Sequence, residues 1–146
     1  MVSVANALTW MGVKTTVKQI ASLSLLSGAR VSGGTNMRML LKAAGTKYGL
    51  TFSVSDEIGT SFPLIANCGG NGMFSTWGHY IAVYGRFGKK LLIADSGWYK
   101  GKYAKASRKA VTDLGDGLLL ASPDVLEKDC EGRSPKYYLI QERNGE

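Results

Sequence analysis

The sequence has few of the residues from which cross-linked or metal-dependent proteins are built. Its 146 residues include one histidine and two cysteines, Cys68 and Cys130. Two cysteines cannot form the disulfide framework of a small secreted scaffold. With a single histidine, they also cannot supply the four ligands of an ordinary structural zinc site. The sequence therefore implies no metal, and nothing in it indicates an organic cofactor.

Long hydrophobic segments and export signals are also missing. No apolar run approaches the roughly 18 residues that a membrane-spanning helix needs. The first residues show neither the charged segment nor the apolar segment of a secretory signal peptide. These absences leave the cellular location and its redox state open.

The residues that are present fit one folded domain with an excess of positive charge. Hydrophobic residues make up 45% of the chain and charged residues 20%, which is ordinary for a globular protein and excludes disorder. The 18 lysines and arginines outnumber the 11 acidic residues, for a formal net charge of +7. Such a charge would suit a polyanionic cell-wall or membrane surface.

The densest basic cluster lies at residues 100–109 and is interleaved with Tyr99 and Tyr103. Basic residues that alternate with aromatic ones can bind nucleic acid. A solvated surface with long lysine side chains explains the same pattern, and we favour it. Binding to DNA or RNA that weakens steeply with salt would support the nucleic-acid interpretation.

The first third of the chain has the apolar spacing of helices. Residues 2–11 predict a first helix. Thr16 and Gln19 form a capping box for a second helix, which ends before Gly28. The expected apolar side of this second helix comprises Val17, Ile20, Leu23 and Leu25.

A third helix is expected between Thr35 or Asn36 and Gly49, after which the hydrophobic period becomes that of strands. A short helix should begin at Ser122 and Pro123. Helices first and sheet second predict a single α+β domain over residues 1–146, without repeats or an internal linker. The expected strands cover residues 50–54, 63–67, 79–85, 89–95, 118–121 and 136–141.

Two of these strands form a hairpin that carries the best functional clue. A three-residue loop at residues 86–88 would place Gly88 in the left-handed conformation that such loops favour. Opposed residues then share a face of the sheet, and the only histidine lies opposite an aspartate. The predicted pairs are Val83 with Leu91, Ile81 with Ile93 and His79 with Asp95.

An aspartate beside a histidine has a direct chemical use. It holds the imidazole in one tautomer and stabilises the imidazolium that forms when the ring accepts a proton. A nucleophile, Ser or Cys, would have to come from another element. From the hairpin alone, a structural pair of His79 and Asp95 at a sheet edge is an equal alternative.

The sequence resembles the papain-like cysteine peptidases that process bacteriocin leaders, and their broader relatives in bacterial surface and phage proteins. The resemblance covers nearly the whole chain in the right order. It implies a papain-like fold in which N-terminal helices pack on a C-terminal antiparallel sheet, with His79 and Asp95 as catalytic residues. The similar segments are residues 18–21, 33–35, 40–50, 63–66, 78–85 and 91–95.

In that family the nucleophilic cysteine opens the first helix, which places its equivalent at or just before Met1. Neither this cysteine nor the upstream glutamine of the oxyanion hole is present, and Ser96 replaces a common proline. Three explanations stay open. The chain is truncated before the nucleophile, the protein binds peptides without cutting them, or Cys68 substitutes. The third is the weakest, because Cys68 follows a strand and lacks a helix dipole.

The resemblance implies a cysteine peptidase-like hydrolase acting on peptide amide bonds, with a peptide or peptidoglycan-peptide as substrate. A bacterial cell-wall substrate is suggested by the net charge of +7. The alternative is a catalytically inactive peptide-binding module of the same fold. A secreted, cell-surface or phage-associated location within a larger protein is compatible with either interpretation.

Overall fold

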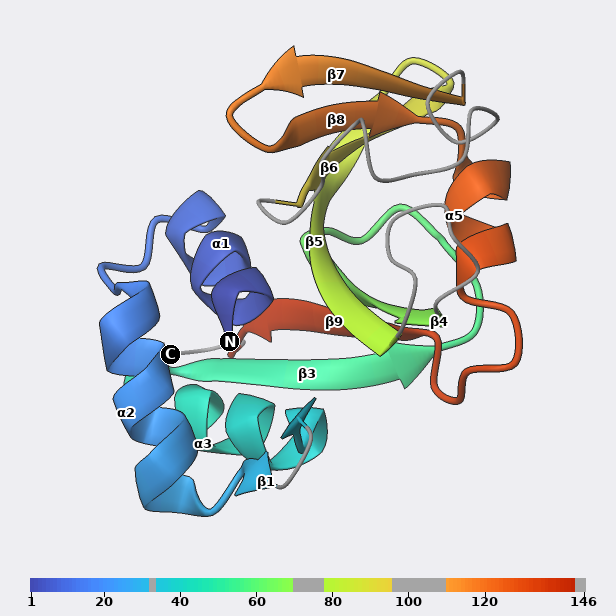
Figure 1. Ribbon diagram of the computed structural model, residues 1–146. Coiled ribbons are helices and arrows are strands. Elements are labelled where there is room, and N and C mark those ends of the chain that lie inside the picture. The colour runs from blue at the N-terminus through green and yellow to red at the C-terminus, as the bar shows by residue number, and fades with distance from the viewer. Residues whose placement is uncertain (32–33, 70–77, 96–109, 144–146) are drawn as a thin grey trace.

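The fold is a strongly curved antiparallel sheet with helices on both sides (Figure 1). The computed structural model describes residues 1–31, 34–69, 78–95 and 110–143. The basic cluster at residues 100–109 lies outside these ranges. The helices are α1 (Val2–Trp10), α2 (Val17–Ser27), α3 (Met37–Tyr48) and α5 (Pro123–Asp129). The strands are β1 (Arg30–Val31), β2 (Gly34–Thr35), β3 (Leu50–Ser55), β4 (Leu64–Gly69), β5 (Gly78–Phe87), β6 (Lys90–Ala94), β7 (Val111–Gly115), β8 (Leu118–Ala121) and β9 (Tyr137–Glu142).

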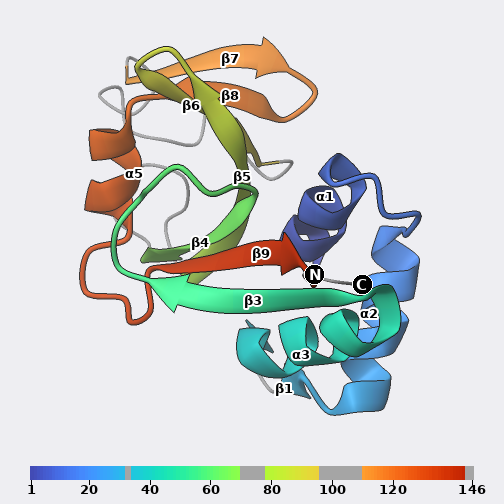
Figure 2. The ribbon, with the colours of Figure 1, turned by 180° about the vertical axis from the view of Figure 1, so that it is seen from behind.

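The main sheet has the strand order β3-β9-β4-β5-β6-β8-β7, and every pairing among the described residues is antiparallel. Figures 1 and 2 show α1, α2 and α3 on one side of the sheet and α5 on the other. Each side buries its own apolar cluster, and residues that alternate along β5 divide between the two clusters. The expected α+β architecture, with helices first and sheet second, is confirmed.

The helix ends follow the capping signals in the sequence. The Thr16 hydroxyl accepts a hydrogen bond from the Gln19 amide at 3.1 Å. The side chain of Asn36 accepts from the Met39 amide at 3.2 Å, so α3 begins where the sequence predicts. The left-handed conformation of Gly49, with φ of 72°, ends α3.

The expected apolar side of α2 is partly wrong. Ile20 is buried, but Val17 is 44% exposed and Leu25 is 70% exposed. The spacing of hydrophobic residues predicts which face of a helix is apolar, but burial also requires another element to pack on that face. Among the described residues, no element covers Val17 and Leu25. The ribbon β1–β2 and strand β7 were also not predicted from the sequence. None of the helices in the described ranges has the length and hydrophobicity that a membrane-spanning helix needs.

Gly45 of α3 lies close to the backbone of the following strand, and a substitution there should destabilise the fold. A Cβ atom at Gly45 would lie 2.6 Å from the backbone carbonyl oxygen of Leu50. We expect Gly45→Ala to cost about 1–3 kcal/mol, because this overpacking outweighs the roughly 1 kcal/mol that alanine gains in a helix. Thermal unfolding should show a melting temperature lower by about 5 °C.

The matched control is Gly59→Ala, where the new methyl group meets nothing within 4 Å. Its melting temperature should stay within about 2 °C of the wild type. A Gly45→Ala protein as stable as the wild type would contradict the close approach of α3 to β3.

Candidate active site

His79 and Asp95 are in direct contact, as the sequence predicted. The Nε2 atom of His79 lies 3.0 Å from the Oδ1 atom of Asp95. His79 is the second residue of β5, and Asp95 directly follows β6. The His79 side chain is 35% exposed, whereas that of Asp95 is only 1% exposed. The pair therefore has a buried carboxylate that holds an imidazole open to solvent.

The predicted strand register is wrong, although the contact is right. The loop comprises Gly88 and Lys89 instead of residues 86–88, because Phe87 pairs with Lys90. Gly85 lies opposite Leu92, and Val83 lies opposite Ile93. Two steps along β5 therefore correspond to one step along β6. Tyr84 is thus the extra residue of a β-bulge in β5.

The bulge at Tyr84 determines on which face of the sheet His79 lies. Without the extra residue, the register near the loop would pair Val83 with Ala94, and His79 and Asp95 would point to opposite faces. With the extra residue, the observed register differs from the predicted one by two residues, so His79 and Asp95 again lie on the same face of the sheet. Asp95 is then a diagonal neighbour of His79, within reach of its side chain.

The contact with Asp95 fixes the orientation of the His79 ring. A carboxylate oxygen only accepts hydrogen bonds, so the Nε2 atom of His79 must carry the proton that it donates to Asp95. In the neutral ring the Nδ1 atom then keeps its lone pair. This arrangement gives His79 a free basic nitrogen and a partner for the imidazolium that forms when Nδ1 takes up a proton.

Helix α1 packs on β5 through buried side chains such as Val4 and Leu8, and an aromatic stack near the bulge adds to this contact. The rings of Trp10 and Tyr84 are 4.4 Å apart and nearly parallel, with 2° between their planes. Figures 1 and 2 show α1 and β5 running in the same direction. Since the stack joins their C-terminal parts, the first residues of α1 lie at the end of the fold where β5 begins with Gly78 and His79.

The first turn of α1 is electropositive and lacks a side-chain cap. Met1 makes no capping hydrogen bond with its side chain, and no acidic residue lies in the first turn. The Arg30 guanidinium lies close to this turn, with its Nη1 atom 3.6 Å from the Met1 Sδ atom. The uncapped amides of the helix and Arg30 would both stabilise an anion at this end of α1.

Helix α1 and the His79 side chain lie on opposite faces of β5. The helix shares its apolar cluster with Tyr80 and Ala82, whereas Ile81 belongs to the cluster on the other face. His79 alternates with Tyr80 and therefore shares the face of Ile81. A group at the start of α1 would therefore have to approach His79 around the N-terminal end of β5.

Neither cysteine is placed to act as a nucleophile. Cys68 lies inside β4 instead of after a strand, directly opposite His79, but it is fully buried, as is Cys130. A hydrogen bond with Cys130 and burial raise the pKa of the Cys68 thiol well above its usual value. Among the described residues, no group of three or more His, Cys, Asp and Glu side chains could hold a metal ion.

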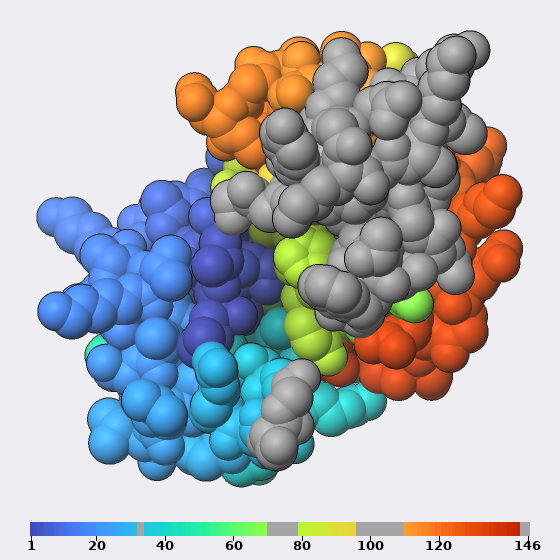
Figure 3. All heavy atoms as spheres, viewed as in Figure 1, coloured from blue at the N-terminus to red at the C-terminus, as the bar shows by residue number. Residues whose placement is uncertain are grey.

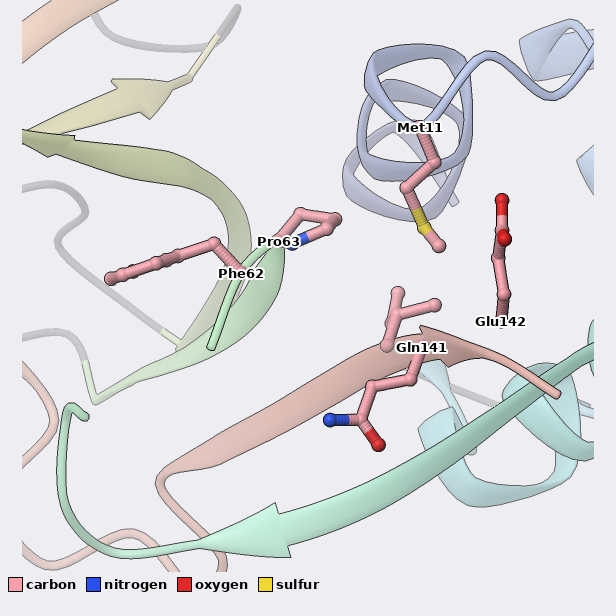
Figure 4. Close-up of a pocket in the computed structure, with 6 residues that line it drawn as sticks. Met11, Phe62, Pro63, Gln141 and Glu142 are labelled. Atoms are coloured by element: carbon pink, nitrogen blue, oxygen red, sulfur yellow. The ribbon is translucent and has the colours of Figure 1, made fainter. Parts of the chain in front are cut away.

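A hollow in the described surface lies away from this pair, at the C-terminal end of α1. It has a volume of about 430 Å³ and is lined by Met11, Phe62, Pro63 and the end of β9. Figure 4 shows the Met11 side chain pointing between Pro63 and Glu142. His79 and Asp95 do not line this hollow, so it is not the space in which the pair would act.

The ring orientation of His79 can be measured directly, because it is the only histidine in the chain. We expect the neutral ring to be the Nε2–H tautomer, since Asp95 accepts from that nitrogen. Long-range proton–nitrogen NMR spectra distinguish the two tautomers. The Asp95→Ala protein should show a mixture of both, whereas a dominant Nδ1–H tautomer in the wild type would contradict the geometry.

Both thiols should be inert in the folded protein. Because Cys68 and Cys130 are fully buried and the pKa of Cys68 is raised, little thiolate is available at pH 8. We expect iodoacetamide to label neither cysteine in native protein and both in urea, as read by mass spectrometry. Rapid labelling of native Cys68 would return it to the list of nucleophile candidates.

No protein-family model matches the sequence, and no curated protein matches it either. The structure is similar to the crystal structure of the peptidase domain of Streptococcus ComA, described as a bi-functional ABC transporter involved in a quorum sensing pathway. The TM-score is 0.61 and the sequence identity 14%, over 97% of this chain and 88% of that chain. At this identity the likeness concerns the fold. The chain has the α+β, papain-like fold of a peptidase domain.

Proposed function

We propose that this domain is a cysteine peptidase-like hydrolase in which His79 is the catalytic base and Asp95 orients it. The observation that carries the proposal is the 3.0 Å contact between the His79 Nε2 atom and the Asp95 carboxylate, in a peptidase-domain fold. It leaves the Nδ1 atom of His79 to exchange protons with a nucleophile and a leaving group.

The proposed nucleophile is a cysteine outside these 146 residues, joined to the start of α1. Both cysteines of the chain are buried and unsuited to attack, whereas the electropositive first turn of α1 would lower the pKa of a thiol there. Such a thiol would reach His79 around the Gly78 end of β5.

The proposed reaction is acyl transfer in two stages. His79 removes the thiol proton, the sulfur attacks the peptide carbonyl carbon, and the uncapped amides of α1 stabilise the oxyanion. The C–N bond then breaks, and the imidazolium of His79 returns its proton to the leaving amine. Water, deprotonated by His79, hydrolyses the thioester and releases the thiol.

The proposed substrate is a peptide within a polyanionic setting such as a bacterial cell wall. The formal net charge of +7 supports this class of substrate, because an anionic polymer would concentrate the protein at its surface. The pair of His79 and Asp95 itself carries no information about the peptide side chains.

A second candidate function is peptide binding without hydrolysis. It is favoured by the observation that neither cysteine of the chain lies in α1 or is exposed. The sequence that precedes α1 in the gene separates the two candidates. A binding module has neither Cys nor Ser there, and it would retain peptides intact.

The decisive experiment measures peptide hydrolysis by the protein together with its own upstream sequence. We expect His79→Ala to lower kcat/KM by about 10³-fold or more, because the nucleophile loses its base. Asp95→Asn should lower kcat/KM by about 10²-fold to 10⁴-fold, because the neutral amide of asparagine cannot stabilise the imidazolium as the carboxylate does. Fluorescence of a quenched peptide library provides the rate.

The matched control is Lys89→Ala in the exposed loop of the same hairpin, which should keep the wild-type rate. Circular dichroism should show that all three variants are folded. A His79→Ala protein with the wild-type rate would refute the catalytic role of His79. A wild type that binds the peptides but leaves them uncut would favour the binding module.

A further inference from the structure

The charges of the chain are strongly segregated. Residues 1–55, which form α1 to α3 and β1 to β3 and are here called the helical lobe, contain six lysines and arginines and no acidic residue. All 11 acidic residues lie in the remainder. The six cations of the lobe are exposed, and within the described part of the chain none forms an ion pair. They are Lys14, Lys18, Arg30, Arg38, Lys42 and Lys47.

The helical lobe also holds most of the exposed apolar side chains. Of the ten large hydrophobic residues exposed in the described ranges, eight belong to it. The extreme cases are consecutive residues near the end of α2, with Leu25 70% exposed and Leu26 87% exposed. Two adjacent leucines in water are unfavourable, so a partner that covers them would stabilise the surface.

Four of these apolar residues and three of the cations lie on α2, on β1 and on the adjoining part of α3. The two helices pack together, and Met39 of α3 lies against Gly28, two residues after Leu26, at 3.6 Å from a Cβ built there. Met39 and Lys42 line one shallow hollow with Ser27. We call this surface the α2–α3 patch. It comprises Leu25, Leu26, Val31 and Met39 with the cations Lys18, Arg30 and Lys42.

The helical spacing places cations and leucines on the same outer face. In α2, Leu25 follows Lys18 by seven residues, which is two helical turns, so both point outward over Ser22. In α3, Lys42 follows Met39 by three residues and shares its face of the helix, whereas Arg38 lines a different hollow with Val54 and Asp56. Figure 3 shows the helical lobe, in blue, forming one side of the molecule.

We propose that the α2–α3 patch docks on the surface of an anionic phospholipid membrane. Apolar side chains surrounded by cations match the interface, where leucines enter the acyl boundary and cations contact phosphate head groups. A nucleic acid or an acidic soluble polymer would use the cations but would leave Leu25 and Leu26 in water. The exposed leucines are therefore the observation that selects a lipid surface.

The test uses co-sedimentation with vesicles of phosphatidylcholine, with and without 50% phosphatidylglycerol. The wild-type chain should bind the anionic vesicles and not the neutral ones. We expect Leu25→Ser with Leu26→Ser to weaken binding at least tenfold, because both side chains lose their burial in lipid. Lys18→Gln with Lys42→Gln should weaken it by about fivefold for each charge removed.

The matched control is Phe87→Ser with Leu114→Ser, which removes two side chains of similar exposure, 56% and 52%, outside the helical lobe. This variant should bind like the wild type. All substituted positions are exposed, and thermal melting confirms that each variant is folded. His79 takes no part, so the result is independent of the proposed hydrolysis.

Three results would overturn the proposal. Binding that survives the loss of both leucines but not of the charges would show general attraction to polyanions, and equal binding to single-stranded DNA would identify it. Equal weakening by the Phe87 and Leu114 control would show that the α2–α3 patch has no special role. Absence of binding to the anionic vesicles at low salt would exclude docking.

Discussion

The β-bulge at Tyr84 is the constraint on which the candidate site depends. One extra residue in β5 decides which side chains of this strand point to each face of the sheet. It brings His79 to the face of Asp95, where the two side chains come within 3.0 Å. The same residue supplies the ring on which Trp10 of α1 stacks. The bulge thus lies next to a contact between β5 and α1.

The sheet divides the molecule into two apolar clusters with different roles. On one face, α1 to α3 pack against alternate residues of β5, such as Ala82. On the other face, α5 covers the cluster that contains Cys68 and Ile81, and the candidate dyad lies at its edge. This division explains why a nucleophile at α1 would have to approach His79 around the start of β5.

The helical lobe is distinct from the rest of the chain in charge as well as in position. Its sequence contains six lysines and arginines and no acidic residue, and it leaves Leu25 and Leu26 exposed to solvent. Exposed charge and exposed apolar surface on the same helices suit an interface better than an isolated domain. The candidate dyad and the α2–α3 patch share no residue. The patch could therefore bind a membrane surface while the dyad acts on a peptide.

The sequence by itself determined the features that depend on neighbouring residues. The caps at Thr16 and Asn36 and the end of α3 at Gly49 could be predicted, because capping hydrogen bonds and left-handed glycines are local. The pairing of His79 with Asp95 could also be predicted, although the predicted register was wrong by two residues. Only the tertiary structure decided the bulge at Tyr84, the exposure of Leu25 and the burial of both cysteines. Each of these depends on which distant segments pack together, and no local propensity encodes that choice.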